Sequence, residues 1–112
     1  MKKCLAPFVM ITMSAGALAS TSVTGHVKDL SIQKDLGSFV FVLLDAPQTA
    51  PIACQSNPTW TYTFPQATTT DKQILAMLML AKATGQTVTL QGSGACSDFP
   101  GIESAIRIDT QQ

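Results

Sequence analysis

The sequence predicts a small, mainly β domain that carries one helix and one disulfide and is exported from the cytoplasm. Three observations lead to this prediction. The chain begins with an export signal, short β-branched and aromatic runs alternate with proline and glycine, and two cysteines remain once the signal is removed. At 112 residues the chain has room for one domain.

The N-terminal segment has the three parts of a signal peptide. Met1-Lys2-Lys3 is basic, residues 4–17 are largely apolar, and Ala17-Leu18-Ala19 fits the small-x-small pattern of a cleavage site. We therefore expect residues 1–19 to be cleaved between Ala19 and Ser20, leaving 20–112 as a periplasmic or secreted domain. The alternative is a retained anchor, but the apolar stretch is shorter than the ~20 residues that a membrane-spanning helix needs.

The charge balance argues against a nucleic-acid partner. Loss of the signal removes Lys2 and Lys3, so that five basic residues face seven acidic ones. The remaining basic residues are scattered and form no run: Lys28, Lys34, Lys72, Lys82 and Arg107. Binding to a phosphate backbone needs clustered Lys and Arg, so we expect no nucleic-acid binding.

Two cysteines remain after export, because Cys4 leaves with the signal. In an oxidising compartment Cys54 and Cys96 are expected to form a disulfide. It would close a loop of about 43 residues, which the chain-entropy model values at roughly 4 kcal/mol. A metal site would need these cysteines with His26 and a fourth ligand. Their spacing is not that of zinc ligands, and we expect neither metal nor cofactor.

Alternating and continuous apolar runs predict the strands. The sharpest alternation is Thr59 to Phe64, where Trp60, Tyr62 and Phe64 are expected on one face and the threonines on the other. Continuous apolar residues at 38–44 indicate a central strand covered on both faces. The complete set is 22–33, 38–44, 59–64, 86–91 and 102–109, with a short piece at 51–54, a turn at 34–37 and a loop at 92–101.

One helix is predicted over residues 71–84, which are rich in strong helix formers. Residues 68–71 offer N-cap side chains, and Gly85 suits the position after the helix. Asp71 near the N-terminus and Lys82 near the C-terminus agree with the helix dipole. The order is thus three strands, one helix and two strands.

That order is the order of the OB-fold, a five-stranded Greek-key barrel with a helix between strands 3 and 4. A small antiparallel sandwich with the helix packed across it is the alternative. No repeat, low-complexity tract or internal linker divides the domain.

Residues 52–108 resemble a group of small secreted bacterial proteins and the B subunits of bacterial A–B toxins of the subtilase cytotoxin and typhoid toxin type. The resemblance rests on two cysteines, an aromatic strand, and an apolar helix that leads into T-G-Q-x-V. The matching residues are Cys54, Trp60, Phe64, 81–88, 92–96 and Glu103. It implies an OB-fold, assembly into a ring and glycan binding at a cell surface. The chain is shorter than the toxin subunits, and their sugar-binding residues find no match in it.

Two places are candidates for ligand binding. The aromatic face of 59–64 is suited to stacking on sugars or bases, although aromatic rings also fill the core of small barrels. Tyr62 and Phe64 are expected in the core and Trp60 is the best candidate for an exposed platform. Asp98 and Phe99, in the loop 92–101, offer an acceptor and an apolar contact, although such residues are also ordinary turn formers.

The helix is more apolar than one buried stripe requires. Residues 74–81 are eight consecutive apolar residues. Five of them span roughly 200° of the helix and Leu80 lies outside that arc: Ile74, Leu75, Met77, Leu78 and Met79. The surplus predicts a homo-oligomer interface with Leu75, Met77, Met79 and Leu80, unless the N-terminal segment or the loop 46–58 covers it.

The sequence carries no catalytic motif, and we expect no enzyme activity. His26 is the one histidine, and a Ser-His-Asp site would have to use it. Paired carboxylates stay open among Asp29, Asp35, Asp45, Asp98 and Glu103, but no motif supports them. Three hypotheses follow in order: a glycan-binding or self-assembling module, an envelope protein that binds another protein, and a small hydrolase.

Overall fold

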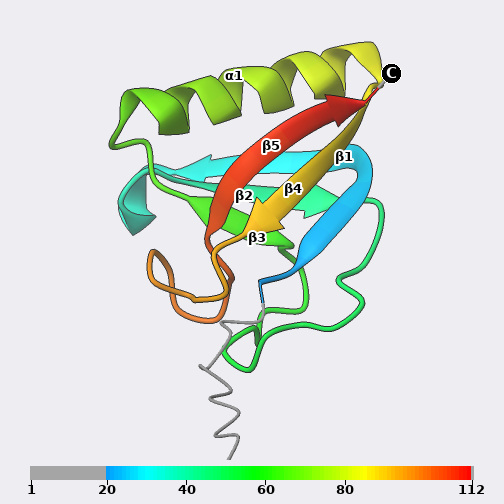
Figure 1. Ribbon diagram of the computed structural model, residues 1–112. Helices are drawn as coiled ribbons and strands as arrows, with labels where there is room; N and C mark the ends of the chain where they lie inside the picture. Colours follow the sequence, from blue (N-terminus) through cyan, green and yellow to red (C-terminus); the bar gives the residue numbers. More distant parts are fainter. Residues whose placement is uncertain (1–19, 112) are drawn as a thin grey trace, which may run out of the picture.

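The computed structural model describes residues 20–111; the expected signal peptide 1–19, with Ala19 and Cys4, lies outside the described residues. Its elements are β1 (Ser22–Gln33), the 3-10 turn η1 (Lys34–Leu36), β2 (Phe39–Leu44), β3 (Tyr62–Phe64), α1 (Thr69–Thr84), β4 (Thr87–Gly92) and β5 (Ala105–Gln111). Three strands, one helix and two strands therefore follow one another as predicted (Figure 1).

The strands form one five-stranded sheet in the order β3-β2-β1-β4-β5, with antiparallel pairing throughout. The long strand β1 makes this order possible, because its first half pairs with β4 and its second half with β2. The register shifts between Val27 and Asp29, where β1 passes from one partner to the other. Such a bulge bends a strand and increases its twist.

The two ends of the sheet meet. Thr63 of β3 lies in a parallel bridge with Ser104, just before β5, and the Thr63 N–H donates to the Glu103 carbonyl at 3.1 Å. The sheet thus curls until its first and last strands touch. Curling removes part of the exposed strand edge, which would otherwise pair with other chains.

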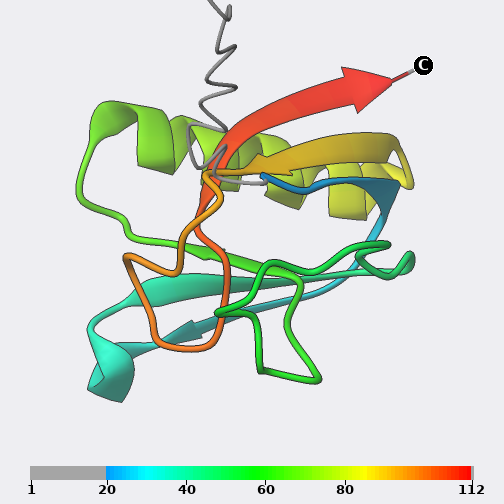
Figure 2. The same cartoon turned by 60° about the horizontal axis from the view of Figure 1, so that its bottom comes forward.

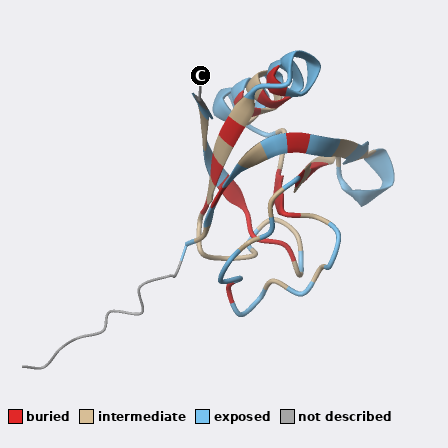
Figure 3. Cartoon of the chain, turned by 90° about the vertical axis from the view of Figure 1, so that its right-hand side faces the viewer, coloured by how far each residue is buried: buried red, intermediate tan, exposed pale blue. Residues whose placement is uncertain are grey.

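The interior of the curled sheet is apolar. Its members come from every strand and from one face of α1 (Figure 3): Val23, Val27, Val40, Val42, Leu44, Tyr62, Phe64, Ile74, Leu78, Ala81, Val88, Leu90 and Ala105. The alternation of buried residues in β4, at Val88 and Leu90, follows the period of two that places one strand face inward.

The helix α1 begins at Thr69, two residues before the predicted start. The Thr68 Oγ1 accepts from the Asp71 N–H at 3.1 Å, and the Asp71 carboxylate accepts from the Thr68 N–H at 3.0 Å. This capping box satisfies two of the free N–H groups at the helix start. At the other end Gly85 adopts φ 70°, the left-handed conformation that glycine allows.

Three predicted strands are wrong in extent, and one of them, 102–109, begins only at Ala105 and runs to Gln111. Residues 51–54 form no strand, and of residues 59–64 only Tyr62–Phe64 pair as β3. Residues 45–61 instead form a long connection, the 45–61 loop, which lies with the 93–104 loop at the end of the molecule opposite α1 (Figures 1 and 2). Proline at positions 47, 51 and 58 limits ladder pairing in that stretch.

Candidate functional site

The candidate site lies where the 45–61 loop folds back over the end of β2. Its start is fixed to β1 by Asp45, whose Oδ1 accepts from the His26 N–H at 2.7 Å while its Oδ2 contacts the His26 Nδ1 at 3.0 Å. These hydrogen bonds hold the pKa of the Asp45 carboxyl below its ordinary value. A Cβ at Gly25 would overlap the Asp45 Oδ1, so glycine permits this close approach.

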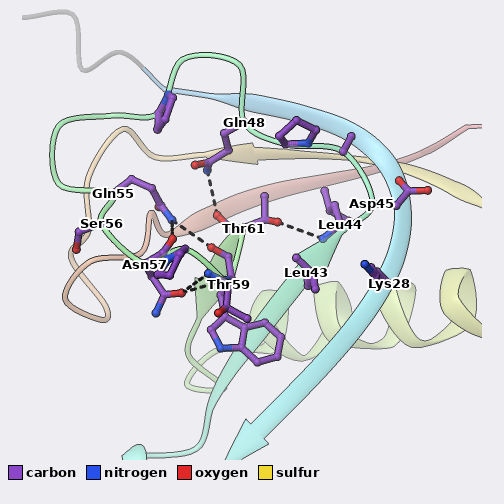
Figure 4. A pocket seen from close by; sticks show the side chains of 15 residues that line it. Lys28, Leu43, Leu44, Asp45, Gln48, Gln55, Ser56, Asn57, Thr59 and Thr61 are labelled. Atoms are coloured by element: carbon purple, nitrogen blue, oxygen red, sulfur yellow. Dashed lines mark hydrogen bonds between the residues drawn. The ribbon is translucent and has the colours of Figure 1, made fainter.

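Two glutamines cross-link the 45–61 loop, and one of them also reaches the 93–104 loop. The Gln48 Nε2 donates to the Thr61 carbonyl at 3.0 Å. The Gln55 Nε2 donates to the Trp60 carbonyl at 3.1 Å (Figure 4). The Gln55 Oε1 accepts from the Glu103 N–H at 2.7 Å. Side-chain amides thus replace the ladder hydrogen bonds that a strand would have made.

Asn57 turns the chain before Trp60. Its Oδ1 accepts from the N–H groups of Thr59 at 2.9 Å and Trp60 at 3.0 Å (Figure 4). Such a turn mimics a backbone turn and takes the local chain out of an extended conformation. The prediction that Trp60 shares a face with Tyr62 and Phe64 is therefore wrong, because the alternation begins only after this turn.

The 45–61 loop is joined to the 93–104 loop in two further ways, besides the Gln55 side chain. Cys54 and Cys96 form the predicted disulfide, with their Cα atoms 6.1 Å apart. The N–H groups of Ser56 and Asn57 donate to the Gly101 carbonyl at 2.9 and 3.0 Å. One covalent and two backbone links therefore hold the two loops together.

Aromatic rings fill the space beneath the two loops. Phe41 is buried on the face of β2 opposite the hydrophobic core of the curled sheet, with the Phe99 ring centroid at 5.1 Å and the Trp60 ring centroid at 5.8 Å. Phe39 contacts Phe99 at 6.0 Å. β2 is thus covered on both faces, as its continuous apolar sequence predicted.

A pocket of about 390 Å³ opens between the 45–61 loop, β1 and the end of β2 (Figure 4). Its floor includes buried Leu44 and Thr61, and its walls are half-buried or exposed side chains. The lining residues are Lys28, 43–48, Pro51 and 55–61. Trp60, the chain's one tryptophan, is among them.

Three hydrogen-bond donors at this pocket have no acceptor within the described part of the chain: the Lys28 Nζ, the Asn57 Nδ2 and the Trp60 Nε1. Lys28 uses only its backbone carbonyl, which accepts from the Lys82 Nζ at 3.0 Å. An indole ring beside free amide and ammonium donors offers apolar contact together with polar orientation, the usual combination in ligand pockets.

Of the predicted ligand residues, only Trp60 lines the pocket. Phe99 lies outside it in the aromatic cluster with Phe41, and the Asp98 N–H donates to the Ser104 Oγ at 3.2 Å. No pattern in the sequence selected Lys28 or Asn57 as pocket residues. The S-N-P-T-W run marked Asn57 as a turn former, which is the one signal that pointed to its place.

His26, the predicted centre of any hydrolytic site, lies between Asp45 and Thr87. Its Nδ1 faces the Asp45 Oδ2 at 3.0 Å and its Nε2 faces the Thr87 Oγ1 at 3.4 Å. The side chains of His26 and Asp45 are 55% and 46% exposed. Water competes for every hydrogen bond at such an open site, so the geometry favours anchoring of the loop over catalysis. Within residues 20–111 no three His, Cys, Asp or Glu side chains gather as a metal site would require.

A second polar cluster, absent from the sequence predictions, lies inside the domain. The Glu103 carboxylate is fully buried and accepts from the Thr21 Oγ1 at 2.6 Å, the Thr21 N–H at 3.3 Å and the Gly94 N–H at 3.0 Å. The Tyr62 hydroxyl joins at 2.6 Å from the Thr21 Oγ1. Burial, and secondarily the Glu103 charge, raises the pKa of Tyr62 above its ordinary value.

The residues predicted for an oligomer interface fall into two groups. Leu75 packs against the core and Met77 is half-buried, whereas Met79 and Leu80 are 57% and 59% exposed. α1 therefore leaves part of its apolar surface exposed, at Met79 and Leu80. Within the described residues no helix is long and apolar enough to cross a membrane.

Fold and site together define a small disulfide-linked β domain with an open pocket between the 45–61 loop and the strands β1 and β2. No family model, curated protein or solved structure matches the chain. The resemblance to toxin B subunits therefore stays a prediction from the sequence, and function has to be argued from the site.

Proposed function

We propose that the chain is an exported, non-enzymatic binding module with an OB-fold, whose ligand is a glycan held in the pocket beside Trp60. Its strand circuit supports the OB-fold part, because β1 pairs with both β2 and β4 while β3 meets β5 in parallel. A helix between β3 and β4 agrees with the same fold.

The observation that carries the glycan proposal is the chemistry of the pocket. A sugar ring presents an apolar face of C–H groups and a rim of hydroxyls. The indole of Trp60 suits the first, and the unpaired donors of Asn57 and Lys28 suit the second. Links to β1 and to the 93–104 loop hold the pocket in place, which lowers the entropy cost of binding.

The test is a glycan array probed with the processed protein, followed by fluorescence titration of each hit. Trp60 is the only tryptophan, so a change in tryptophan emission reports the pocket directly. Trp60→Ala should abolish array binding, and Trp60→Phe should retain part of it. Absence of any hit at high protein concentration would contradict the proposal.

A matched pair of lysines sharpens this test. Lys28 lines the pocket, whereas Lys34 is exposed on η1 outside it. Lys28→Met should weaken glycan binding about tenfold, since a charge-assisted hydrogen bond contributes about 1.5 kcal/mol or more. Lys34→Met should leave affinity unchanged. Equal effects of the two variants would mean that only net charge matters.

Self-assembly is a second candidate function, and exposed Met79 and Leu80 on α1 favour it. Light scattering of the processed protein should then give a mass above that of the monomer, and Met79→Lys with Leu80→Lys should return it to the monomer mass. A clean monomer at high micromolar concentration would remove this candidate and leave a contact with another envelope protein as the use of that surface.

A further inference from the structure

The buried carboxylate of Glu103 has hydrogen-bond donors but no opposite charge. Thr21 and Gly94 supply three donors, all of them neutral. No lysine, arginine or histidine among residues 20–111 forms an ion pair or hydrogen bond with it. A fully buried charged group is rare unless it is paired, because the interior solvates charge poorly.

The surroundings of Glu103 are defined from every side. Gly92 on β4 leaves the room, since a Cβ there would overlap the Glu103 Oε2 and Cδ. Gly94 donates from the 93–104 loop, Thr21 donates from the segment before β1, and Tyr62 joins from β3. Tyr62 is the one titratable group besides Glu103 in this network, and a phenol supplies no positive charge.

The chain itself has a cation to offer at this place. Removal of residues 1–19 would make Ser20 the first residue, with a free α-ammonium group. The next nitrogen along the chain, the Thr21 N–H, lies 3.3 Å from the Glu103 Oε2. Consecutive backbone nitrogens are joined by three bonds and lie less than about 4 Å apart, so the Ser20 nitrogen lies within about 7 Å of the carboxylate. Ser20 is exposed, and rotation about its backbone bonds can bring the ammonium into contact with Glu103.

We propose that the α-ammonium group released at Ser20 by signal cleavage pairs with Glu103 and completes the buried network of Thr21 and Tyr62. Maturation then does more than remove the leader, because it creates the counter-charge for the barrel's one fully buried carboxylate among the described residues. The inference rests on the predicted cleavage site and is independent of what the Trp60 pocket binds.

The proposal fixes a pH dependence. A carboxylate beside the ammonium favours its charged form, which raises the pKa of the α-amino group above the ordinary ~7.7–8.0. The folded-state pKa is then above the unfolded-state value. The stability gained is present in full below about pH 7.7 and is lost as pH rises through the raised folded-state value.

The experiment uses protein processed from the full chain by its own export signal, with the N-terminal residue read by mass spectrometry. The pH profile of α-amino acetylation then gives the pKa. A rise of about one unit should slow acetylation at pH 8 about fivefold relative to an ordinary N-terminus. An N-terminus other than Ser20, or an α-amino pKa of ordinary value, would overturn the proposal.

Two variants separate pairing from simple crowding. Inserting Gly-Ser between Ala19 and Ser20 moves the new terminus two residues away and should restore the ordinary α-amino pKa while leaving the fold intact. Glu103→Gln should restore it without moving the terminus; if this variant does not fold, the insertion alone decides. An unchanged pKa in the insertion variant would mean that Glu103 does not hold the terminus.

Discussion

Phe41 and Val42 are neighbours on β2, yet different parts of the chain bury them. Val42 points into the hydrophobic core of the curled sheet, where other strands and α1 surround it. Phe41 points the other way and is covered by Trp60 and Phe99 from two loops. The core side of β2, which Val42 faces, depends on regular apolar strands and a helix. The loop side of β2, which Phe41 faces, depends on a disulfide, side-chain amides and three further rings.

This difference explains where the pocket lies. The strands and the helix on the core side pack close together, and the backbone N–H and C=O groups of the strands are paired within the sheet. The loop side is held at a few fixed points, so gaps remain between them and side-chain donors stay free. Binding residues commonly lie on loops positioned by a rigid scaffold for the same reason.

The largest expected effect comes from removing the covalent link on the loop side. Cys54→Ser with Cys96→Ser should lower the free energy of unfolding by roughly 4 kcal/mol, since the closed loop spans a sequence separation of 42. Urea unfolding measures this loss. Hydrogen exchange should increase most in the 45–61 and 93–104 loops; a uniform increase over all strands would mean that the two sides are not separable.

The matching change on the core side is Leu78→Ala. Leu78 is fully buried on α1, so its truncation should cost about 3 kcal/mol in urea unfolding. Because Leu78 does not touch the pocket, ligand affinity of the folded variant should be unchanged. A loss of affinity beyond twofold would show that the pocket depends on the packing of α1.

A smaller effect is expected from Gln55→Ala, which removes one anchor of the 45–61 loop. The buried Glu103 N–H would lose its acceptor, at a cost of about 1–2 kcal/mol. Gln73→Ala, on the exposed surface of α1, is the control and should change the free energy of unfolding by less than about 0.5 kcal/mol. Equal losses in both variants would contradict an anchoring role for Gln55.

The smallest effect at neutral pH is expected from Tyr62→Phe. Because burial raises the pKa of Tyr62, its neutral form is favoured in the folded state. The associated stability is present below the ordinary value of 10.0 and is lost as pH rises through the higher folded-state pKa. Unfolding measured from pH 8 to 11 should show a weaker alkaline loss in the variant; parallel curves would contradict this.

The strands and the helix of the core side were predicted well from the sequence, whereas the contacts of the loop side were predicted poorly. Periodicity located β1, β2 and β4, because each has a local pattern imposed by burial on one or both faces. Capping residues located the helix. The predicted helix lacked Thr69 and Thr70, because the residue that caps it is Thr68. The disulfide was predictable because two cysteines follow the expected signal peptide.

The loop side was not predictable from local pattern. Thr59 to Phe64 alternates along its whole length, but the Asn57 side chain binds two N–H groups and turns the first part of that run away from the sheet. Gln55 meets Glu103 across 48 residues of sequence, and Thr21 meets it across 82. Contacts between such distant residues depend on the closed fold and leave no local signal.

The most direct test of the proposed binding site is a map of where ligand binds in solution. Backbone amide chemical shifts of the processed protein, recorded with a panel of mono- and oligosaccharides, should change at Lys28, 43–48 and 55–61. Shifts confined to the α1 surface or to the Phe99 side of the loops, or no shift with any sugar, would contradict the assignment of this pocket.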